Sequence, residues 1–172
     1  MAITAPINLK EWVEENRDLL KPPVGNKCVY EDSQSFIMVV GGPNLRKDYH
    51  VNVMEEFFYQ IEGDIVLKTV QEGKIIPIPI KEGEIFLLPP NIPHSPQRPT
   101  NSVGLVLERK RPSGKLDGFK WFCEECTTVL YEEELQVTNI VKQLPPVFDR
   151  FYAKKENQKC KKCDWEMQVP AR

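Results

Sequence analysis

Between about residue 27 and residue 109, the chain alternates short runs of β-prone residues with glycine-containing turns. The turns fall at Gly41-Gly42-Pro43, Glu62-Gly63, Gln71-Glu72-Gly73 and Glu82-Gly83. The runs between them, which we expect to form strands, lie at 35–40, 56–61, 64–70, 75–80, 84–88 and 103–108. Many short strands with little helix are typical of an antiparallel sandwich or barrel. The spacing therefore predicts an all-β core.

A helix is expected before this core, over residues 8–20. Asn8 is suited to cap its first turn, and Glu11 occupies the position from which a capping box is completed. Pro22 and Pro23 end the helix, because proline lacks the amide hydrogen that a continuing helix needs.

Turn residues at 111–114 and at 117–118 mark the exit from the core. A helical stretch is expected near 132–143, followed by the last cysteines of the chain. The expected divisions are an N-terminal helix and lead-in at 1–22, a barrel at 23–112 and a C-terminal appendage at 113–172.

Composition narrows the class of partner. The formal net charge is −2 and lysine and arginine do not gather into a stripe, so a nucleic-acid partner is not expected. No apolar run approaches the roughly 20 residues of a membrane span. The first residues lack the basic and then apolar pattern of a secretory signal. We therefore expect a cytoplasmic protein without a membrane partner.

Four of the five cysteines form two C-x-x-C pairs. Cys123 and Cys126 make the first pair, and Cys160 and Cys163 follow after 33 intervening residues. In a reducing compartment such pairs favour a tetrathiolate metal site over disulfides, with redox thiols or incidental cysteines as the alternative. Zinc and iron are equally acceptable to four thiolates. Cys28 stands alone and is expected to be a small buried hydrophobe.

The chain has two histidines, His50 and His94, and both have a candidate metal-binding context. His50 and Glu56 are six residues apart, and residues of equal parity share one face of a strand. Two imidazoles and one carboxylate are the smallest set that binds a divalent metal and leaves positions open for substrate and oxygen. The alternative is a pair of structural histidines bonded to backbone groups.

These spacings resemble the two motifs of the cupin family. The matching positions are His50, Glu56 and Gly63 in the first motif and Gly83, Pro89 and His94 in the second. Asn52 stands where the family has a second histidine, Asn91 replaces a glycine, and Arg98 replaces the final asparagine. The resemblance implies a cupin-type double-stranded β-helix, or jelly-roll, barrel.

Three further residues suit an anionic substrate. Arg46 lies four residues before His50 and Arg98 four residues after His94. A guanidinium can hold a carboxylate through two hydrogen bonds. Glu108 ends a strongly apolar run, so it needs a partner from a neighbouring arginine at 109 or 111 or from the substrate. Surface ion pairs are the alternative for each residue alone.

Longer segments resemble the 3-hydroxyanthranilate 3,4-dioxygenase family, in its short form from bacteria and fungi. The segments are 20–26, 39–44, 48–50, 55–60, 93–99 and 116–118, together with both cysteine pairs. The resemblance implies an N-terminal helix, a cupin barrel and a small metal-stapled C-terminal appendage. It also implies a homodimer.

In that family His50, Glu56 and His94 would hold catalytic Fe(II). Arg46 would lie near the dioxygen and carboxylate side of the substrate, and Arg98 would clamp its carboxylate. The remaining implied roles are proton movement for Glu108, pocket lining for Asn26, and a second iron, or zinc, for Cys123, Cys126, Cys160 and Cys163. The implied reactants are 3-hydroxyanthranilate and O2, and the product leads to quinolinate and NAD.

Other functions remain open at this point. The alternatives are a cupin oxygenase that acts on another small aromatic acid or thiol, a non-catalytic cupin that binds a carboxylate, and a cupin isomerase. Oxygen consumption separates these alternatives, because a carboxylate sensor binds without consuming oxygen and an isomerase works anaerobically.

Overall fold

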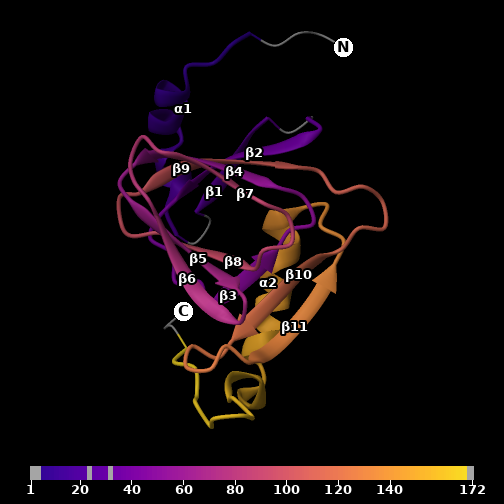
Figure 1. Ribbon diagram of the computed structural model, residues 1–172. Helices are drawn as coiled ribbons and strands as arrows, with labels where there is room; N and C mark the ends of the chain where they lie inside the picture. The colour runs from indigo at the N-terminus through magenta and orange to yellow at the C-terminus, as the bar shows by residue number, and fades with distance from the viewer. Residues whose placement is uncertain (1–4, 23–24, 31–32, 170–172) are drawn as a thin grey trace.

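The computed structural model describes residues 5–22, 25–30 and 33–169 (Figure 1). The expected domain limits at residues 1, 23 and 172 lie outside these residues. The helices are α1 (Leu9–Glu15) and α2 (Ile140–Tyr152), with short 3-10 turns η1 (Arg17–Leu20) and η2 (Lys155–Gln158). The strands are β1 (Asn26–Tyr30), β2 (Ser35–Gly41), β3 (Asp48–Val51), β4 (Glu56–Glu62), β5 (Ile65–Gln71), β6 (Lys74–Ile80), β7 (Ile85–Leu88), β8 (His94–Gln97), β9 (Val103–Arg109), β10 (Asp117–Phe122) and β11 (Val129–Leu135).

Two antiparallel sheets form the core, as the sequence predicted. The first has the order β1-β2-β9-β4-β7, and the second has the order β11-β10-β3-β8-β5-β6 (Figure 1). All six strands expected from the sequence are present, each within one residue of its expected limits. In β5 burial alternates with a period of two, because successive side chains point to opposite faces. The architecture is the cupin-type barrel that the motifs predicted.

Apolar side chains from both sheets fill the space between them. The buried members of this cluster are Met38, Phe58, Ile65, Leu67, Ile80, Leu88 and Val106. Cys28, expected to be a buried hydrophobe, is half-buried and packs against the same cluster. Burial of this apolar surface is the main favourable term that holds the sheets together.

The expected N-terminal helix divides into α1 and the 3-10 turn η1. The Asn8 side chain accepts hydrogen bonds from the backbone amides of Lys10 and Glu11, which confirms its role as the cap. Val13 and Leu20 pack with buried residues of β2 and β9, so the segment covers an outer face of the first sheet.

The prediction of a helix near 132–143 is wrong. Strand β11 occupies most of that range and pairs with β10, so that Glu132 lies opposite Lys120 and forms an ion pair with it. The helix begins only at α2, where the Asn139 side chain accepts from the amide of Lys142. Inter-strand hydrogen bonds to β10 override the helical preference of the glutamate run. Two prolines inside α2, which commonly end helices, obscured its extent in the sequence.

The sheet does not end near residue 112, where the sequence placed the end of the barrel. Strand β10 pairs with β3, and Phe119 lies directly opposite His50. A strand from the expected appendage therefore flanks the strand that carries the first histidine. The division into three domains remains a prediction.

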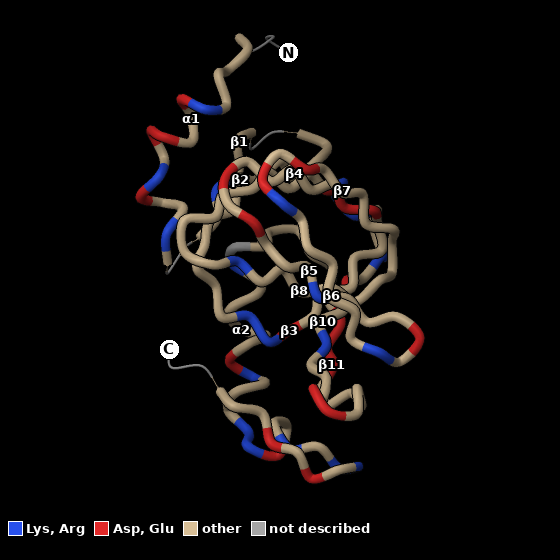
Figure 2. Tube along the Cα trace, turned by 60° about the vertical axis from the view of Figure 1, so that its left-hand side comes forward, with Lys and Arg blue, Asp and Glu red and all other residues tan. Residues whose placement is uncertain are grey.

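A second apolar cluster joins α2 to β10, β11 and the C-terminal segment (Figure 1). Its buried members are Phe119, Trp121, Val137, Val147, Phe151 and Met167. In Figure 2 acidic and basic residues are interspersed along the trace, with no continuous basic stripe on the part of the chain that is drawn. Among the described residues, no helix has the length and apolar character needed to cross a membrane.

Candidate metal and substrate site

The two facing sheets bring His50, Glu56 and His94 together. His50 on β3 is paired with His94 on β8 in the second sheet, and Glu56 comes from β4 in the first sheet. One Glu56 carboxylate oxygen lies 3.3 Å from Nδ1 of His50, and the other lies 3.2 Å from Nε2 of His94. All three ligand atoms lie within 4.8 Å of one another. The residues predicted as metal ligands therefore form one buried cluster.

The outward bonds of both imidazoles fit metal ligation. His94 donates through Nδ1 to the carbonyl of Ile92 at 3.0 Å, which leaves Nε2 facing Glu56. Nε2 of His50 lies 2.7 Å from an Asp117 carboxylate oxygen, which leaves Nδ1 facing Glu56. Metal-binding histidines usually donate their other nitrogen in this way. The donor set thus fits a divalent metal better than it fits two structural histidines, whose ring nitrogens would both have partners outside the cluster.

Charge within the cluster also suits a cation. Burial raises the pKa of Glu56, but the neighbouring His94 and His50 outweigh it and hold that pKa well below its usual value. Burial lowers the pKa of His50, but hydrogen bonds with Asp117 and Glu56 raise it to about 9. Glu56 is therefore ionised at neutral pH. A bound metal would replace the protons that lie between its carboxylate and the two imidazoles.

Asp117 and Phe119 on β10 hold the His50 ring. Asp117 is fully buried and also accepts from Nε of Arg111, at 2.9 Å from each carboxylate oxygen. Burial raises the pKa of Asp117, but the hydrogen bonds from His50 and Arg111 outweigh it and lower that pKa. The Phe119 ring stacks on the imidazole at a centroid distance of 5.0 Å. From the sequence, Asp117 was expected only as a turn residue within the resembling segment 116–118, with no role in the site.

Asn52 connects Glu56 with Glu108. Its side-chain amide nitrogen lies 2.9 Å from Oε1 of Glu56 and 3.0 Å from Oε2 of Glu108. An amide has two N–H donors, and these two carboxylates accept both. Position 52, where the cupin motif has a histidine, therefore supplies a hydrogen-bond donor that holds the carboxylates in place.

Glu108 finds its partner in Arg111, one of the candidates that the sequence offered. Nη1 of Arg111 lies 2.5 Å from Oε2 of Glu108. The contacts therefore close into a ring that runs through His50, Asp117, Arg111, Glu108, Asn52 and Glu56. Burial and the charge of Glu56, which lies opposite across β4 and β9, raise the pKa of Glu108 to about 7 against the opposing effect of Arg111.

The two predicted arginines differ in their partners. Arg46 forms a two-point ion pair with Asp48, with nitrogen–oxygen distances of 3.2 and 2.6 Å. Arg98 is only 3% exposed, and among the described residues no carboxylate forms an ion pair with it. Burial and the charge of Arg46 lower the pKa of Arg98 to about 10. Arg98 is thus a buried cation without a counter-ion among the residues that the structure describes.

One cavity of about 770 Å³ is lined by the candidate metal ligands and substrate-binding residues, which are Arg46, His50, Glu56, His94, Arg98 and Glu108. Asn26, expected to line the pocket, does so from β1, and Phe58 and Val106 add apolar surface. Helix α2 covers another side of the same cavity, with the side chains of Ile140, Leu144, Pro145, Phe148 and Tyr152. The sequence analysis missed this wall because it placed the helix too early in the chain.

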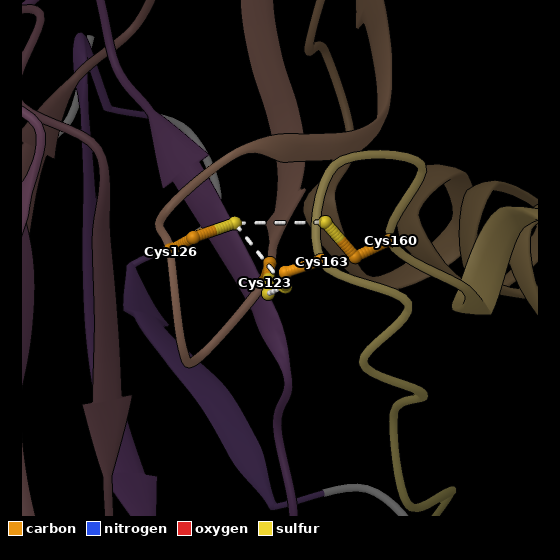
Figure 3. A group of neighbouring side chains, drawn as sticks. All are labelled: Cys123, Cys126, Cys160 and Cys163. Atoms are coloured by element: carbon orange, nitrogen blue, oxygen red, sulfur yellow. Dashed lines mark hydrogen bonds between the residues drawn. The ribbon is translucent and has the colours of Figure 1, made fainter.

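The four cysteines of the two pairs converge outside the barrel (Figure 3). Sulfur–sulfur distances are 3.5 Å from Cys123 to Cys163 and 3.6 Å from Cys126 to Cys160. None of the four forms a disulfide. Tetrahedral thiolate sites have metal–sulfur bonds of about 2.3 Å, which place the sulfurs roughly 3.8 Å apart. The cluster is therefore close to the geometry of a tetrathiolate metal site.

The two cysteine turns have the same backbone structure. In each, the first cysteine's carbonyl accepts from the amide four residues later, and its own amide donates to the carbonyl five residues later. The residues that lie four positions after the first cysteine of each turn are Thr127 and Asp164, and both have a positive φ, of 58° and 59°. Two matched turns present two thiols each to a common centre.

Comparisons with known proteins agree with this geometry. The profile of the 3-hydroxyanthranilic acid dioxygenase family matches residues 1–152. A 3-hydroxyanthranilate 3,4-dioxygenase of Jannaschia sp. (strain CCS1) is 54% identical over 95% of this chain and 91% of its own length. The enzyme of the same name from Xanthomonas euvesicatoria pv. vesicatoria (strain 85-10) is 52% identical over 97% of this chain and 94% of its own.

Among solved structures, a cupin-2 domain containing protein from Shewanella frigidimarina NCIMB 400 has a TM-score of 0.46. It is 16% identical to this chain, and the match covers 60% of this chain and 93% of that one. From the profile and the close relatives, the chain belongs to the 3-hydroxyanthranilic acid dioxygenase family.

Proposed function

We propose that the chain is an Fe(II)-dependent, extradiol-type dioxygenase that converts 3-hydroxyanthranilate and O2 to 2-amino-3-carboxymuconate semialdehyde. One observation carries the proposal: a two-histidine, one-carboxylate cluster shares its cavity with an arginine that has no counter-ion within residues 5–22, 25–30 and 33–169. The names of the close relatives support the same substrate. Both atoms of O2 enter the product as the bond between ring carbons 3 and 4 breaks.

His50, Glu56 and His94 would hold the Fe(II). When bound, the iron supplies a redox-active Lewis acid whose unoccupied positions accept a bidentate ring and dioxygen. The protein contributes a fixed, buried donor set, because the contact ring through Asn52 and Asp117 orients the ligands.

The chain's other residues bind and orient the ring. Arg98 takes the substrate carboxylate in a charge-assisted, two-point hydrogen bond. Arg46 lines the dioxygen and carboxylate side, and Asn26 lines the pocket. Glu108 accepts a proton from the substrate amine at a carboxylate oxygen, for which a pKa near neutrality is suited. The apolar face of α2 excludes water from this side of the cavity.

Oxygen uptake tests the proposal. Purified protein loaded anaerobically with Fe(II) is given 3-hydroxyanthranilate, and oxygen consumption is followed together with the near-ultraviolet absorbance of the semialdehyde. Equal consumption of oxygen and formation of product supports the assignment. Binding without oxygen uptake indicates a carboxylate-binding cupin, and uptake only with another aromatic acid or a thiol indicates a different oxygenase.

For the four cysteines we propose a rubredoxin-like iron that staples the C-terminal segment to the sheet, with zinc as the alternative metal. The matched turns and the sulfur separations support a tetrathiolate site, and they suit either metal. Sulfur-to-iron charge-transfer absorption in the purified protein tests the choice. Its absence together with bound zinc refutes iron at this position.

We also propose a cytoplasmic homodimer. Edge strand β7 of the first sheet carries two exposed apolar side chains, Ile85 and Leu87, at 66% and 54% exposure. Exposed apolar edge strands are surfaces on which a second chain can pair. Sedimentation at equilibrium tests this association, and a mass that stays monomeric at micromolar concentration rejects it.

A further inference from the structure

The floor beneath Arg98 consists of a glutamine and a glycine from two neighbouring strands. Gln60 on β4 lies directly opposite Gly104 on β9. Gln60 is 1% exposed, and its amide nitrogen donates to the carbonyl of Glu62 at 2.8 Å. That bond turns the amide oxygen toward Arg98, whose Nη1 lies 3.4 Å away. The glutamine is therefore held with its acceptor facing the guanidinium.

Gly104 leaves the room that this arrangement needs. A Cβ at position 104 would lie 2.8 Å from the amide oxygen of Gln60 and 2.9 Å from Nη1 of Arg98. Real side chains do not approach so closely, so any larger residue must displace both groups. Both contacts are the ends of flexible side chains, which means that alanine at 104 would shift the guanidinium without breaking the sheet.

The charge of the groups that contact Arg98 affects ligand binding as much as the space around them does. The amide oxygen of Gln60 orients the guanidinium but carries no charge, whereas Arg46 is already neutralised by Asp48. A carboxylate in place of the amide would form an ion pair with Arg98 inside the protein. Arg98 would then contribute less binding free energy to a ligand carboxylate, because the cost of burying its charge would already be compensated within the protein.

We propose that Gln60 and Gly104 are positioning residues that make Arg98 selective for a ring bearing a carboxylate. The uncharged amide oxygen of Gln60 accepts a hydrogen bond from the guanidinium, and the missing side chain of Gly104 lets the guanidinium lie close to the sheet. The inference rests on the proposed function for the identity of the substrate.

The test compares Gln60→Glu with the unchanged protein in two measurements. Anthranilate, which has the amine and carboxylate but no ring hydroxyl, is titrated calorimetrically into metal-free protein. The iron-loaded protein is then assayed with 3-hydroxyanthranilate and with 2-aminophenol, which lacks the carboxylate. We expect anthranilate affinity to fall and KM for 3-hydroxyanthranilate to rise by about tenfold or more, since a charge-assisted pair is lost. The value of kcat and the kinetics with 2-aminophenol should stay unchanged.

Two further variants keep the test decisive. Gln34→Glu introduces the same charge at an exposed position and should leave all values unchanged. Gly104→Ala should raise KM less than Gln60→Glu does, again without a change in kcat, and it decides the matter if Gln60→Glu fails to fold.

Unaltered anthranilate affinity in a folded Gln60→Glu protein overturns the inference, as does an equal loss with both ring substrates. If the unchanged protein consumes no oxygen with 3-hydroxyanthranilate, the proposed function fails. The calorimetric result still stands in that case, because it needs neither iron nor turnover.

Discussion

The cluster of His50, Glu56 and His94 lies between two sheets, whereas the four cysteines lie between two turns outside them. The first cluster draws its ligands from three strands and is supported by a closed ring of buried polar contacts. The second is built by two local turns with the same hydrogen-bond pattern and needs little beyond them.

Coordination number explains the difference. Four thiolates complete a tetrahedral set, so the cysteine cluster leaves no position for a substrate. Three ligands leave positions open, and an incomplete set must be held rigid by its surroundings. We therefore propose a structural role for the cysteine site and a reactive role for the histidine site.

Replacing His50 or His94 by alanine should abolish iron binding at the catalytic site and reduce turnover to background. Two of three protein ligands are too few to retain the metal against water. Iron content and oxygen uptake measure the loss. Metal at the cysteines should remain, visible as its own absorption or zinc content. Unchanged catalytic iron occupancy in either variant would contradict the ligand assignment.

Arg98→Ala should raise KM for 3-hydroxyanthranilate by roughly 30- to 150-fold, which corresponds to a charge-assisted pair worth about 2–3 kcal/mol. Steady-state kinetics give this value. Arg150→Ala is the control, because Arg150 forms an exposed ion pair with Glu133 away from the cavity. An unaltered KM would remove Arg98 from carboxylate binding.

Asp117→Asn should weaken metal affinity at the histidine cluster by about 10- to 100-fold, because it removes the charge that orients His50 and pairs with Arg111. Competition with a coloured chelator measures the affinity without any turnover. The cysteine site should keep its metal. If both sites weaken together, the variant has damaged the fold and the two clusters are not independent.

The pH dependence of turnover should have a limb near pH 7. Burial and Glu56 raise the pKa of Glu108 to about 7, and only the ionised form accepts a proton, so kcat/KM should rise with pH up to about tenfold per unit below that value. The raised pKa means that this group's contribution to stability falls as pH rises from about 4.5 through 7. In Glu108→Gln the limb should disappear, and its persistence would assign it to another group.

Cys160→Ser should have the smallest effect on turnover and a clear effect on stability. Losing a thiolate ligand releases the structural metal and lowers the melting temperature, since metal binding contributes to folding. Values of kcat and KM measured well below that temperature should stay within about twofold. A large loss of activity in a protein that stays folded would show that the cysteine site acts on the catalytic site.

Sequence patterns predicted the catalytic ligands because their spacing reflects local rules. The parity argument for His50 and Glu56 does not apply, because they lie on β3 and β4 in different sheets, whereas the turns before His94 return it to a position opposite His50. The thiolate pairs were equally visible, since each C-x-x-C turn is self-contained. Arg111 was found as a partner of Glu108 because it lies three residues away.

Residues that act across the sheets were harder to find. Asp117 lies 67 residues from His50, and neither its turn signal nor the short resembling segment 116–118 indicates a contact with that histidine. The α2 wall of the cavity was missed because a glutamate run that favours helix pairs as a strand with β10, and because prolines lie inside the helix. Long-range pairing decided both cases, against the local preference.

By itself, then, the sequence determined six of the strands, the two sets of candidate metal ligands and the likeness to one enzyme family, because each depends on spacing over a few residues. Tertiary structure alone decided that Asp117 holds the His50 ring from 67 residues away, and that Arg98 keeps its charge above the uncharged amide of Gln60. The physical reason is that the cost of burying a charge depends on partners brought from distant strands, and chain spacing does not encode those partners.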